Sequence, residues 1–292
     1  MKKIKFRGKS PKRGRLSVIT PKNIALIIVV CVISAVVLFY FVVFPNIKYK
    51  QAVSLMSNDV IQAYEALIAL EGFRDSEKKA NSIYYEYEVE KIKSAMVGEY
   101  VFYGSYEQDN NLSNGEEKIE WRVLEKNGNK VLLISKYCLE NLEYHSSEIN
   151  ATWESCTLRS WLNNDFFINA FSVSERALIQ RTKLGNAPKE NDTEDKVFLL
   201  SYDEIRKYLV SDVERSCRAT PYAISKHINT DDYGNAEWWL RTLEEDEDDV
   251  MIIESDGDIS MWGTIPHGDY TAVRPAIWVS IEQSIFKGML ML

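Results

Sequence analysis

The sequence has few of the residues that mark common catalytic and metal sites. Its 292 residues include three histidines and four cysteines. His145, His227 and His267 are isolated from one another and show no metal-ligand spacing. The chain contains no Gly-x-Ser-x-Gly, so no α/β-hydrolase nucleophile is indicated. We therefore expect no enzyme and no cofactor, with a Cys217–His227 pair as the remaining catalytic alternative.

The cysteines are also too few for a disulfide framework. Cys31 lies in an apolar run, and Cys138, Cys156 and Cys217 make an odd number beyond it, with a spacing that matches no zinc site. The region after residue 98 is long enough to bury a core without crosslinks. We expect buried thiols and at most one bridge.

Residues 24–44 lack any charge, glycine or proline over 21 positions. At about 1.5 Å per residue, such a helix matches a hydrocarbon core about 30 Å thick. The preceding segment carries nine Lys or Arg and no acid, the bias that keeps a flank in the cytoplasm. The pattern predicts a cytoplasmic tail at residues 1–22 and a transmembrane helix at 23–45, with the lipid bilayer as partner of residues 24–44.

A cleaved signal peptide is the alternative. Its apolar region usually spans about 7 to 15 residues and ends at a small-x-small cleavage site. Here the run is longer and ends in Phe-Val-Val-Phe-Pro-Asn. We therefore predict an uncleaved single-pass anchor in the cell membrane, with the C-terminal region outside the cell.

The chain beyond the anchor is short of basic residues. Nine of the 35 basic residues lie in the first 45 positions, so the remainder carries a net charge of −17. Phosphate contacts need clustered Lys and Arg, so we exclude nucleic acid as a partner.

Residues 46–97 read as a helical hairpin that would form a stalk. A break is expected at Pro45-Asn46, and apolar residues then recur at helical spacing from Ala52 to Leu70. Gly72 and Phe73 interrupt the pattern, and Asp75-Ser76 can cap a second helix. The phrase Leu70-x-Gly72-Phe73-x-Asp75-Ser76 resembles the tetratricopeptide-like repeat of surface proteins from Gram-positive bacteria.

From residue 98 to 282 the signals are those of an α+β domain rich in loops and aromatic residues, followed by a C-terminal tail at 283–292. Asn127-Gly128 predicts a hairpin between 119–124 and 130–135. Helices are expected at 156–169, at 174–178 with Ser174 as N-cap, and from Ser201-x-x-Glu204 to Leu209. Further strands are expected at 98–104, 196–201, 236–242, 250–254, 259–262 and 272–280.

Eight ordered motifs run through this region. Among them are Thr152-Trp153-Glu154-x-Cys156-Thr157-Leu158-Arg159-x-Trp161-Leu162-Asn163, Trp238-Trp239-Leu240-Arg241-Thr242 and Ala272-Val273-Arg274-Pro275-Ala276-Ile277-Trp278. In this order they resemble the bacterial domain-of-unknown-function family 6273, over residues 98–280. That family implies no established activity. The closing half is also similar to the formylglycine-generating-enzyme and C-type-lectin-like folds, but no cysteine follows Cys217, so the enzyme's reactive cysteine pair is not carried over.

The arginines and tryptophans of these motifs have two interpretations. A guanidinium among apolar residues must be paired, and Glu154 or Asp203 could accept from Arg159, Arg241 or Arg274. Adjacent strand residues face opposite sides, so Trp238 or Trp239 could meet a ligand. We therefore take Trp238, Trp239, Arg241 and Arg274 as ligand-binding candidates, and Trp121, Trp153, Arg159, Trp161 and Trp278 as structural.

The acidic run at 244–249, followed by Asp256 and Asp258, could offer oxygen ligands to Ca²⁺, although its spacing is not that of an EF-hand. A run of like charge is more often a solvated loop. We therefore expect no metal site and keep Asp256 and Asp258 as weak calcium candidates.

Three functions stay open on these patterns. The first is a non-catalytic module that binds a carbohydrate, peptide or protein at the cell surface. The second is an envelope enzyme on a formylglycine-generating-enzyme-like fold, and the third is a signalling or assembly protein acting through the single helix.

Overall fold

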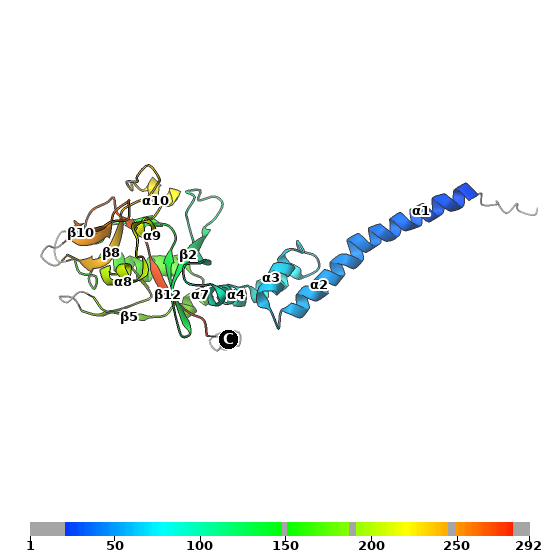
Figure 1. Ribbon diagram of the computed structural model, residues 1–292, viewed down its shortest axis with the longest axis horizontal. Helices are drawn as coiled ribbons and strands as arrows, with labels where there is room; N and C mark the ends of the chain where they lie inside the picture. The colour runs from blue at the N-terminus through cyan, green and yellow to red at the C-terminus, as the bar shows by residue number, and fades with distance from the viewer. Residues whose placement is uncertain (1–20, 148–150, 187–190, 245–248, 283–292) are drawn as a thin grey trace, which may run out of the picture. The chain divides into compact units, whose positions relative to one another are not determined.

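The computed structural model describes residues 21–147, 151–186, 191–244 and 249–282. The chain divides into two compact units, Met1–Ala80 and Asn81–Leu292, which are treated separately below. The structure is mixed α+β, with one long apolar helix near the N-terminus (Figure 1).

The first unit contains one described helix that is long and apolar enough to cross a membrane. It runs from Pro21 to Leu55, and none of its apolar window is buried inside the protein. It consists of α1 (Pro21–Leu38), a π-helical turn η1 (Phe39–Val43) and α2 (Phe44–Leu55).

The expected break at Pro45-Asn46 is wrong, because the helix continues through it. Proline has no N–H and its ring meets the carbonyl one turn earlier, and the wider π turn just before Pro45 gives it room. The Asn46 amide donates to the carbonyl oxygen of Val42 at 2.6 Å.

The stretch expected as one helix, with apolar spacing from Ala52 to Leu70, belongs to two helices. α2 ends at Leu55, and α3 (Val60–Ile68) begins after Asp59, whose side chain accepts from the backbone N–H of Gln62. This N-cap starts a new helix where apolar spacing alone suggested continuity. α4 (Ser76–Ser94) begins where the Asp75-Ser76 signal placed it.

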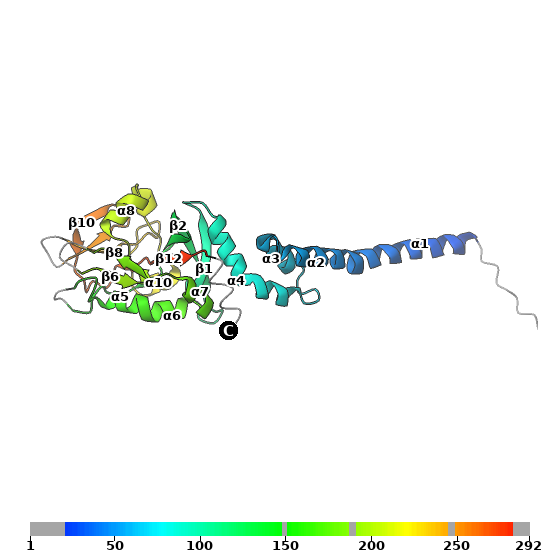
Figure 2. The same cartoon turned by 90° about the horizontal axis from the view of Figure 1, so that it is seen from below.

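The second unit is built on two five-stranded sheets. The first is antiparallel, with the order β1-β2-β3-β12-β7, and the second has the order β10-β9-β8-β11-β4 (Figures 1 and 2). The strands of the first sheet are β1 (Tyr100–Tyr106), β2 (Glu117–Asn127), β3 (Lys130–Ser135), β7 (Val197–Phe198) and β12 (Ala276–Ser280). Those of the second are β4 (Glu140–Asn141), β8 (Trp238–Leu243), β9 (Val250–Ile253), β10 (Ile259–Thr264) and β11 (Ala272–Val273). A separate pair joins β5 (Thr182–Leu184) to β6 (Thr193–Asp195).

The β2–β3 hairpin is confirmed, with Gly128 at φ +61° in its turn. The expected strand 272–280 is instead split at Arg274-Pro275. Its first part, β11, pairs with β8 and β4, and its second part, β12, pairs with β3 and β7. Pro275 cannot donate to a ladder, so the chain leaves one sheet there and enters the other.

Short helices connect the strands. The expected helix 156–169 is present as the continuous run α5 (Thr157–Trp161), η2 (Leu162–Phe166) and α6 (Phe167–Ala170), seen along one side of this unit in Figure 2. α7 (Val173–Leu178) is capped by Ser172, not Ser174, because Ser172 and Glu175 complete a capping box. The others are α8 (Tyr202–Tyr208), which begins with the expected Ser201–Glu204 box, α9 (Asp212–Arg215) and α10 (Pro221–Ser225).

Candidate functional site

A cavity of about 360 Å³ opens beside Trp161. This is within the usual size range of small-molecule sites, which combine apolar or aromatic walls with a few polar groups. The lining residues are Asn141, Leu142, Glu143, Thr157, Leu158, Trp161 and Asp269.

The end of the second sheet forms one wall. β4 pairs with β11, with Asn141 opposite Ala272, which brings the loop containing Asp269 next to β4. The Asn141 amide donates one hydrogen bond to the Asp269 carbonyl oxygen and another to that of Lys226, each at 2.6 Å. Both amide hydrogens are therefore used within the protein.

α5 forms the opposite wall. The Leu158 N–H donates to the carbonyl oxygen of Tyr144 at 3.1 Å, and the Thr157 N–H donates to Nδ1 of His145 at 3.3 Å. Trp161, at the end of α5, is partly buried and packs on Phe166 with ring centroids 5.4 Å apart. The indole is thus supported on one side while it lines the cavity.

The cavity is acidic. None of the described residues that line it is basic, whereas Glu143 and Asp269 are exposed carboxylates without an ion pair to any described residue. The buried Glu140, next to Asn141 in β4, is neutralised, since Lys226 Nζ lies 2.7 Å and the Tyr106 hydroxyl 2.6 Å from its Oε2. Burial is the largest single effect and lowers the pKa of Lys226, but the hydrogen bonds and charges of Glu140 and Tyr222 together outweigh it, so the pKa stands above its ordinary value.

The four ligand-binding candidates lie in the interior. Trp238 and Trp239 are fully buried, and Arg241 and Arg274 are 3% exposed. Trp239 donates its indole N–H to the carbonyl oxygen of Leu142 at 3.0 Å, so it holds the cavity wall from behind. None of these side chains lines the cavity.

Both candidate arginines bind main-chain oxygens and pack in the core. Arg241 donates to the carbonyl oxygen of Leu199 at 2.9 Å and pairs with Glu204. Arg274 donates to the carbonyl oxygen of Ser135 at 3.0 Å and lies 4.8 Å from the centre of the Trp238 ring. The carboxylate beside Arg241 is therefore Glu204, the neighbour of the expected Asp203.

Of the residues expected to be structural, Trp161 lines the cavity, and the others pack within the domain without lining it. Asp195 accepts from Arg159 Nε at 2.7 Å and from the Trp153 indole at 2.9 Å. Glu154 meets Arg159 through its backbone carbonyl oxygen, not through its carboxylate. Trp121 is fully buried and Trp278 is 9% exposed.

A second cavity, of about 370 Å³, contains the almost fully buried carboxylates of Glu88 and Glu175. Lys118 Nζ lies 3.3 Å from Glu88 and 3.6 Å from Glu175, and the Tyr84 hydroxyl donates to Glu88. Glu175 also accepts from the backbone N–H groups of Gly104 and Ser172. Burial raises the pKa of Glu88 in spite of Tyr84 and Lys118.

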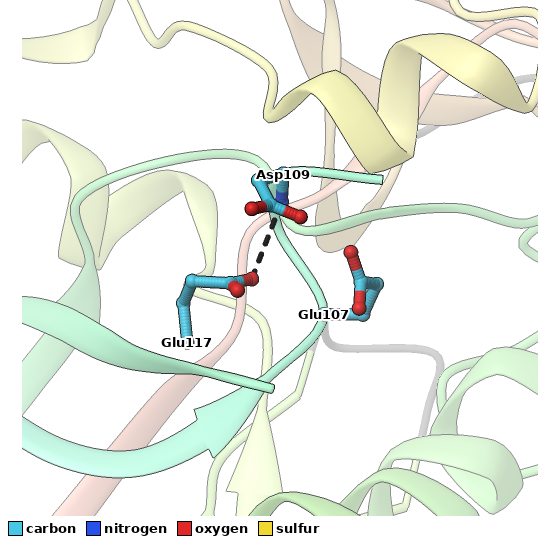
Figure 3. Close-up of side chains that lie close together, drawn as sticks. All are labelled: Glu107, Asp109 and Glu117. Carbon is cyan, nitrogen blue, oxygen red and sulfur yellow. Dashed lines mark hydrogen bonds between the residues drawn. The ribbon is translucent and has the colours of Figure 1, made fainter. Parts of the chain in front are cut away.

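Three carboxylates converge on the loop between β1 and β2 (Figure 3). Glu107, Asp109 and Glu117 each place an oxygen within 4.8 Å of the others. The loop's own backbone already uses them, since Asp109 N–H donates to Glu117 at 3.2 Å and Asn111 N–H to Glu107 at 2.9 Å. The sequence signal for this group is the alternation of acids around Gln108, in Glu107 and Asp109.

The other candidates are not drawn together. Asp256 and Asp258 are exposed, and Asp256 accepts from the backbone N–H of Asp258 at 3.0 Å. Residues 245–248 of the acidic run lie outside the described residues. Cys138, Cys156 and Cys217 are buried and no disulfide joins them, whereas Cys31 is exposed on the apolar helix.

The comparisons with known proteins concern the same region. Residues 128–281, just over half of the chain, match the family described as a domain of unknown function (DUF6273). No curated protein and no solved structure matches the chain. The chain therefore belongs to this family of domains of unknown function.

Proposed function

We propose that this protein is a membrane-tethered module that binds a ligand outside the cell in the Trp161 cavity. The observation that carries the proposal is the combination, in one cavity of about 360 Å³, of a supported indole with acceptor groups at the rim. Aromatic rings contribute large contact area at little cost in conformational entropy, and a few polar groups then orient the ligand.

The membrane attachment and its direction are supported by the N-terminal segment. The helix Pro21–Leu55 is long and apolar enough to span a bilayer, and the nine basic residues before position 45 favour the cytoplasmic side. Protease treatment of right-side-out membrane vesicles checks this orientation. The C-terminal region should be digested, and its protection in intact vesicles would contradict the assignment.

Binding is favoured over catalysis by the groups that line the cavity. Its carboxylates, Glu143 and Asp269, are exposed, and efficient acid–base catalysts are usually tuned by burial or by charged neighbours. The likenesses to C-type lectins and to the tetratricopeptide-like repeat stay predictions from sequence motifs. A lectin-like domain on a helical stalk would suit the same role.

The test is a glycan and peptide array probed with the full chain in detergent or nanodiscs. For the array compounds that bind the native protein, Trp161→Ala should weaken binding by at least about tenfold. The matched control is Trp262→Ala, because Trp262 is 83% exposed and does not line the cavity. Array ligands that bind both variants equally would overturn the assignment of the site. An array on which no compound binds the native protein would overturn it as well.

A packed side chain is also lost in Trp161→Ala, so a second variant keeps the test informative. Thr157→Trp adds volume at the cavity from the exposed first position of α5, where few native contacts are disturbed. It should block the same ligands while the thermal unfolding transition stays close to that of the native protein. Undiminished binding by a folded Thr157→Trp protein would contradict the site.

A further inference from the structure

We infer that the Trp161 cavity recognises a cationic ligand, an organic ammonium group on an apolar stem. The inference rests on the proposed binding function and specifies its ligand class. Three properties of the cavity lead to it: the balance of charge, the direction of its hydrogen bonds, and the ring face of Trp161, which no described cation covers.

The first property is the charge balance. Glu143 and Asp269 line the cavity, and no described Lys, Arg or His forms an ion pair with either. The buried Glu140, next to Asn141 in β4, has its own counter-charge in Lys226 at 2.7 Å. The charge of Glu140 is thus balanced and that of the two lining carboxylates is not, which favours a cation and disfavours an anion.

The second property is the direction of the hydrogen bonds. Asn141 has already given both amide hydrogens to the carbonyl oxygens of Lys226 and Asp269. In their ionised form the two rim carboxylates can only accept hydrogen bonds. Apart from the hydroxyl of Thr157 and the indole N–H of Trp161, the side chains that line the cavity therefore have no hydrogen to offer. Acceptors outnumber donors, which favours a ligand that brings donors of its own.

The third property is the face of Trp161. Other tryptophans of this domain already have a cation, with Arg274 Cζ 4.8 Å from the ring centre of Trp238 and Lys130 Nζ 4.4 Å from that of Trp278. Among the described residues no Lys or Arg lies over Trp161 in this way. An indole beside carboxylates is the strongest aromatic partner for an ammonium group. Leu142 and Leu158 supply the apolar surface for its stem.

The excess of acidic residues beyond the membrane helix also attracts cations, at longer range. The chain after residue 45 carries a net charge of −17. A field of this sign raises the local concentration of cations and speeds their association, and salt weakens the effect.

The test compares two probes of nearly equal shape, choline and its neutral isostere 3,3-dimethylbutan-1-ol. Each is titrated into the full chain in detergent, and the indole N–H signal of Trp161 is followed by NMR, with Trp161→Phe giving its assignment. Choline should bind about fivefold to tenfold more tightly than the alcohol. Equal or tighter binding of the alcohol would overturn the inference.

The double variant Glu143→Gln/Asp269→Asn isolates the carboxylates. It keeps the shape of both side chains and the backbone carbonyl oxygen that Asn141 uses. Choline affinity should fall about fivefold to tenfold, while affinity for the alcohol stays unchanged. An unchanged choline affinity would contradict the role of the rim carboxylates.

The outcomes separate this inference from the proposed function. If array ligands depend on Trp161 but are neutral or anionic, the cavity is a binding site and the cationic ligand class is wrong. If no ligand depends on Trp161 and neither probe shifts its indole signal, both the proposed binding function and the cationic ligand class are wrong. Selective, carboxylate-dependent choline binding supports both.

Discussion

The Trp161 cavity and the cavity beside Lys118 are similar in size but use their carboxylates differently. Beside Trp161, Glu143 and Asp269 are exposed and have no described cation next to them. Beside Lys118, Glu88 and Glu175 are buried and share that lysine. A satisfied charge network stabilises a fold, whereas unsatisfied acceptors at an aromatic wall are available to a ligand. Charge alone therefore does not identify a binding site. Whether the fold supplies an ion-pair partner for a carboxylate distinguishes a structural group from one that is available to a ligand.

The largest effect is expected from Lys118→Met. The variant leaves Glu88 and Glu175 without their cation, and an uncompensated buried charge is costly. Because the Lys118 side chain is 41% exposed, water can replace part of the interaction, and we expect a loss of about 1–3 kcal/mol in the free energy of unfolding. Chemical denaturation of the full chain in detergent, followed by near-UV circular dichroism, measures it.

The control for Lys118→Met is Lys93→Met. Lys93 pairs with Glu90 at 2.7 Å on the exposed side of α4, so its loss should change stability by less than about 0.5 kcal/mol. Equal effects of the two variants would mean that the Lys118 network has no special structural role.

Trp239→Phe tests the wall of the Trp161 cavity from behind. The variant removes the indole hydrogen bond to Leu142 and some packing volume, and should cost about 1–2 kcal/mol of stability. Ligand affinity of the cavity should fall severalfold, because Leu142 is no longer held.

Trp121→Phe is the matched variant for this prediction. It removes another buried indole hydrogen bond, at 2.7 Å to the carbonyl oxygen of Tyr103, in the first sheet. Stability should fall by a similar amount while ligand affinity stays unchanged. If both variants weaken binding equally, the link from Trp239 to the cavity is absent.

The pH dependence of stability tests whether the carboxylates beside Lys118 differ from the exposed carboxylates beside Trp161. The pKa of Glu88 is raised above 4.5 in the folded protein, mainly by burial, so the folded state holds this proton more tightly than the unfolded state. That contribution is complete below pH 4.5 and is lost as the pH rises through the folded pKa. Glu88→Gln has no such proton.

The difference in stability between Glu88→Gln and the native protein should therefore change in favour of the variant as the pH rises from 4.5 toward neutrality. We expect a smaller effect than that of Lys118→Met, because Lys118 and Tyr84 still stabilise the ionised form. Unfolding curves at several pH values measure it. A difference that does not vary with pH would refute the raised pKa.

The smallest change in stability is expected at the rim of the Trp161 cavity. Glu143→Gln/Asp269→Asn removes two exposed charges that no described residue pairs, so the unfolding free energy should shift by less than about 0.5 kcal/mol. The same denaturation measurement checks it. A large loss would place these carboxylates in the structural network, as in the second cavity.

Much of the secondary structure could be predicted because its signals are local. Asn127-Gly128 specified a turn, Ser201 and Glu204 specified a helix start, and the apolar spacing of 156–169 specified a helix. Each depends on residues within one or two turns of the chain. The failures at Pro45 and at Pro275 arose where the surroundings determined how the chain accommodates a proline.

The site could not be predicted in the same way. Trp161, Trp238 and Trp239 all occur in apolar phrases, and nothing local separates an indole in the core from one that lines a cavity. Alternation along β8 implied that one of its two tryptophans would face outward, but both faces of that strand are covered, and both tryptophans are fully buried. The lining residues come from distant segments, β4, α5 and the loop before β11.

The sequence by itself determined the apolar helix, the asymmetry of charge, the α+β class and the family, because length, composition and short-range spacing encode these properties. Only the tertiary structure decided which tryptophan lines a cavity and which carboxylates have partners. The physical reason is that burial and ion pairing depend on contacts between distant segments, such as Asp195 with Arg159 and Lys118 with Glu88. Those contacts form only when α5 has packed beside β6 and α4 beside β2.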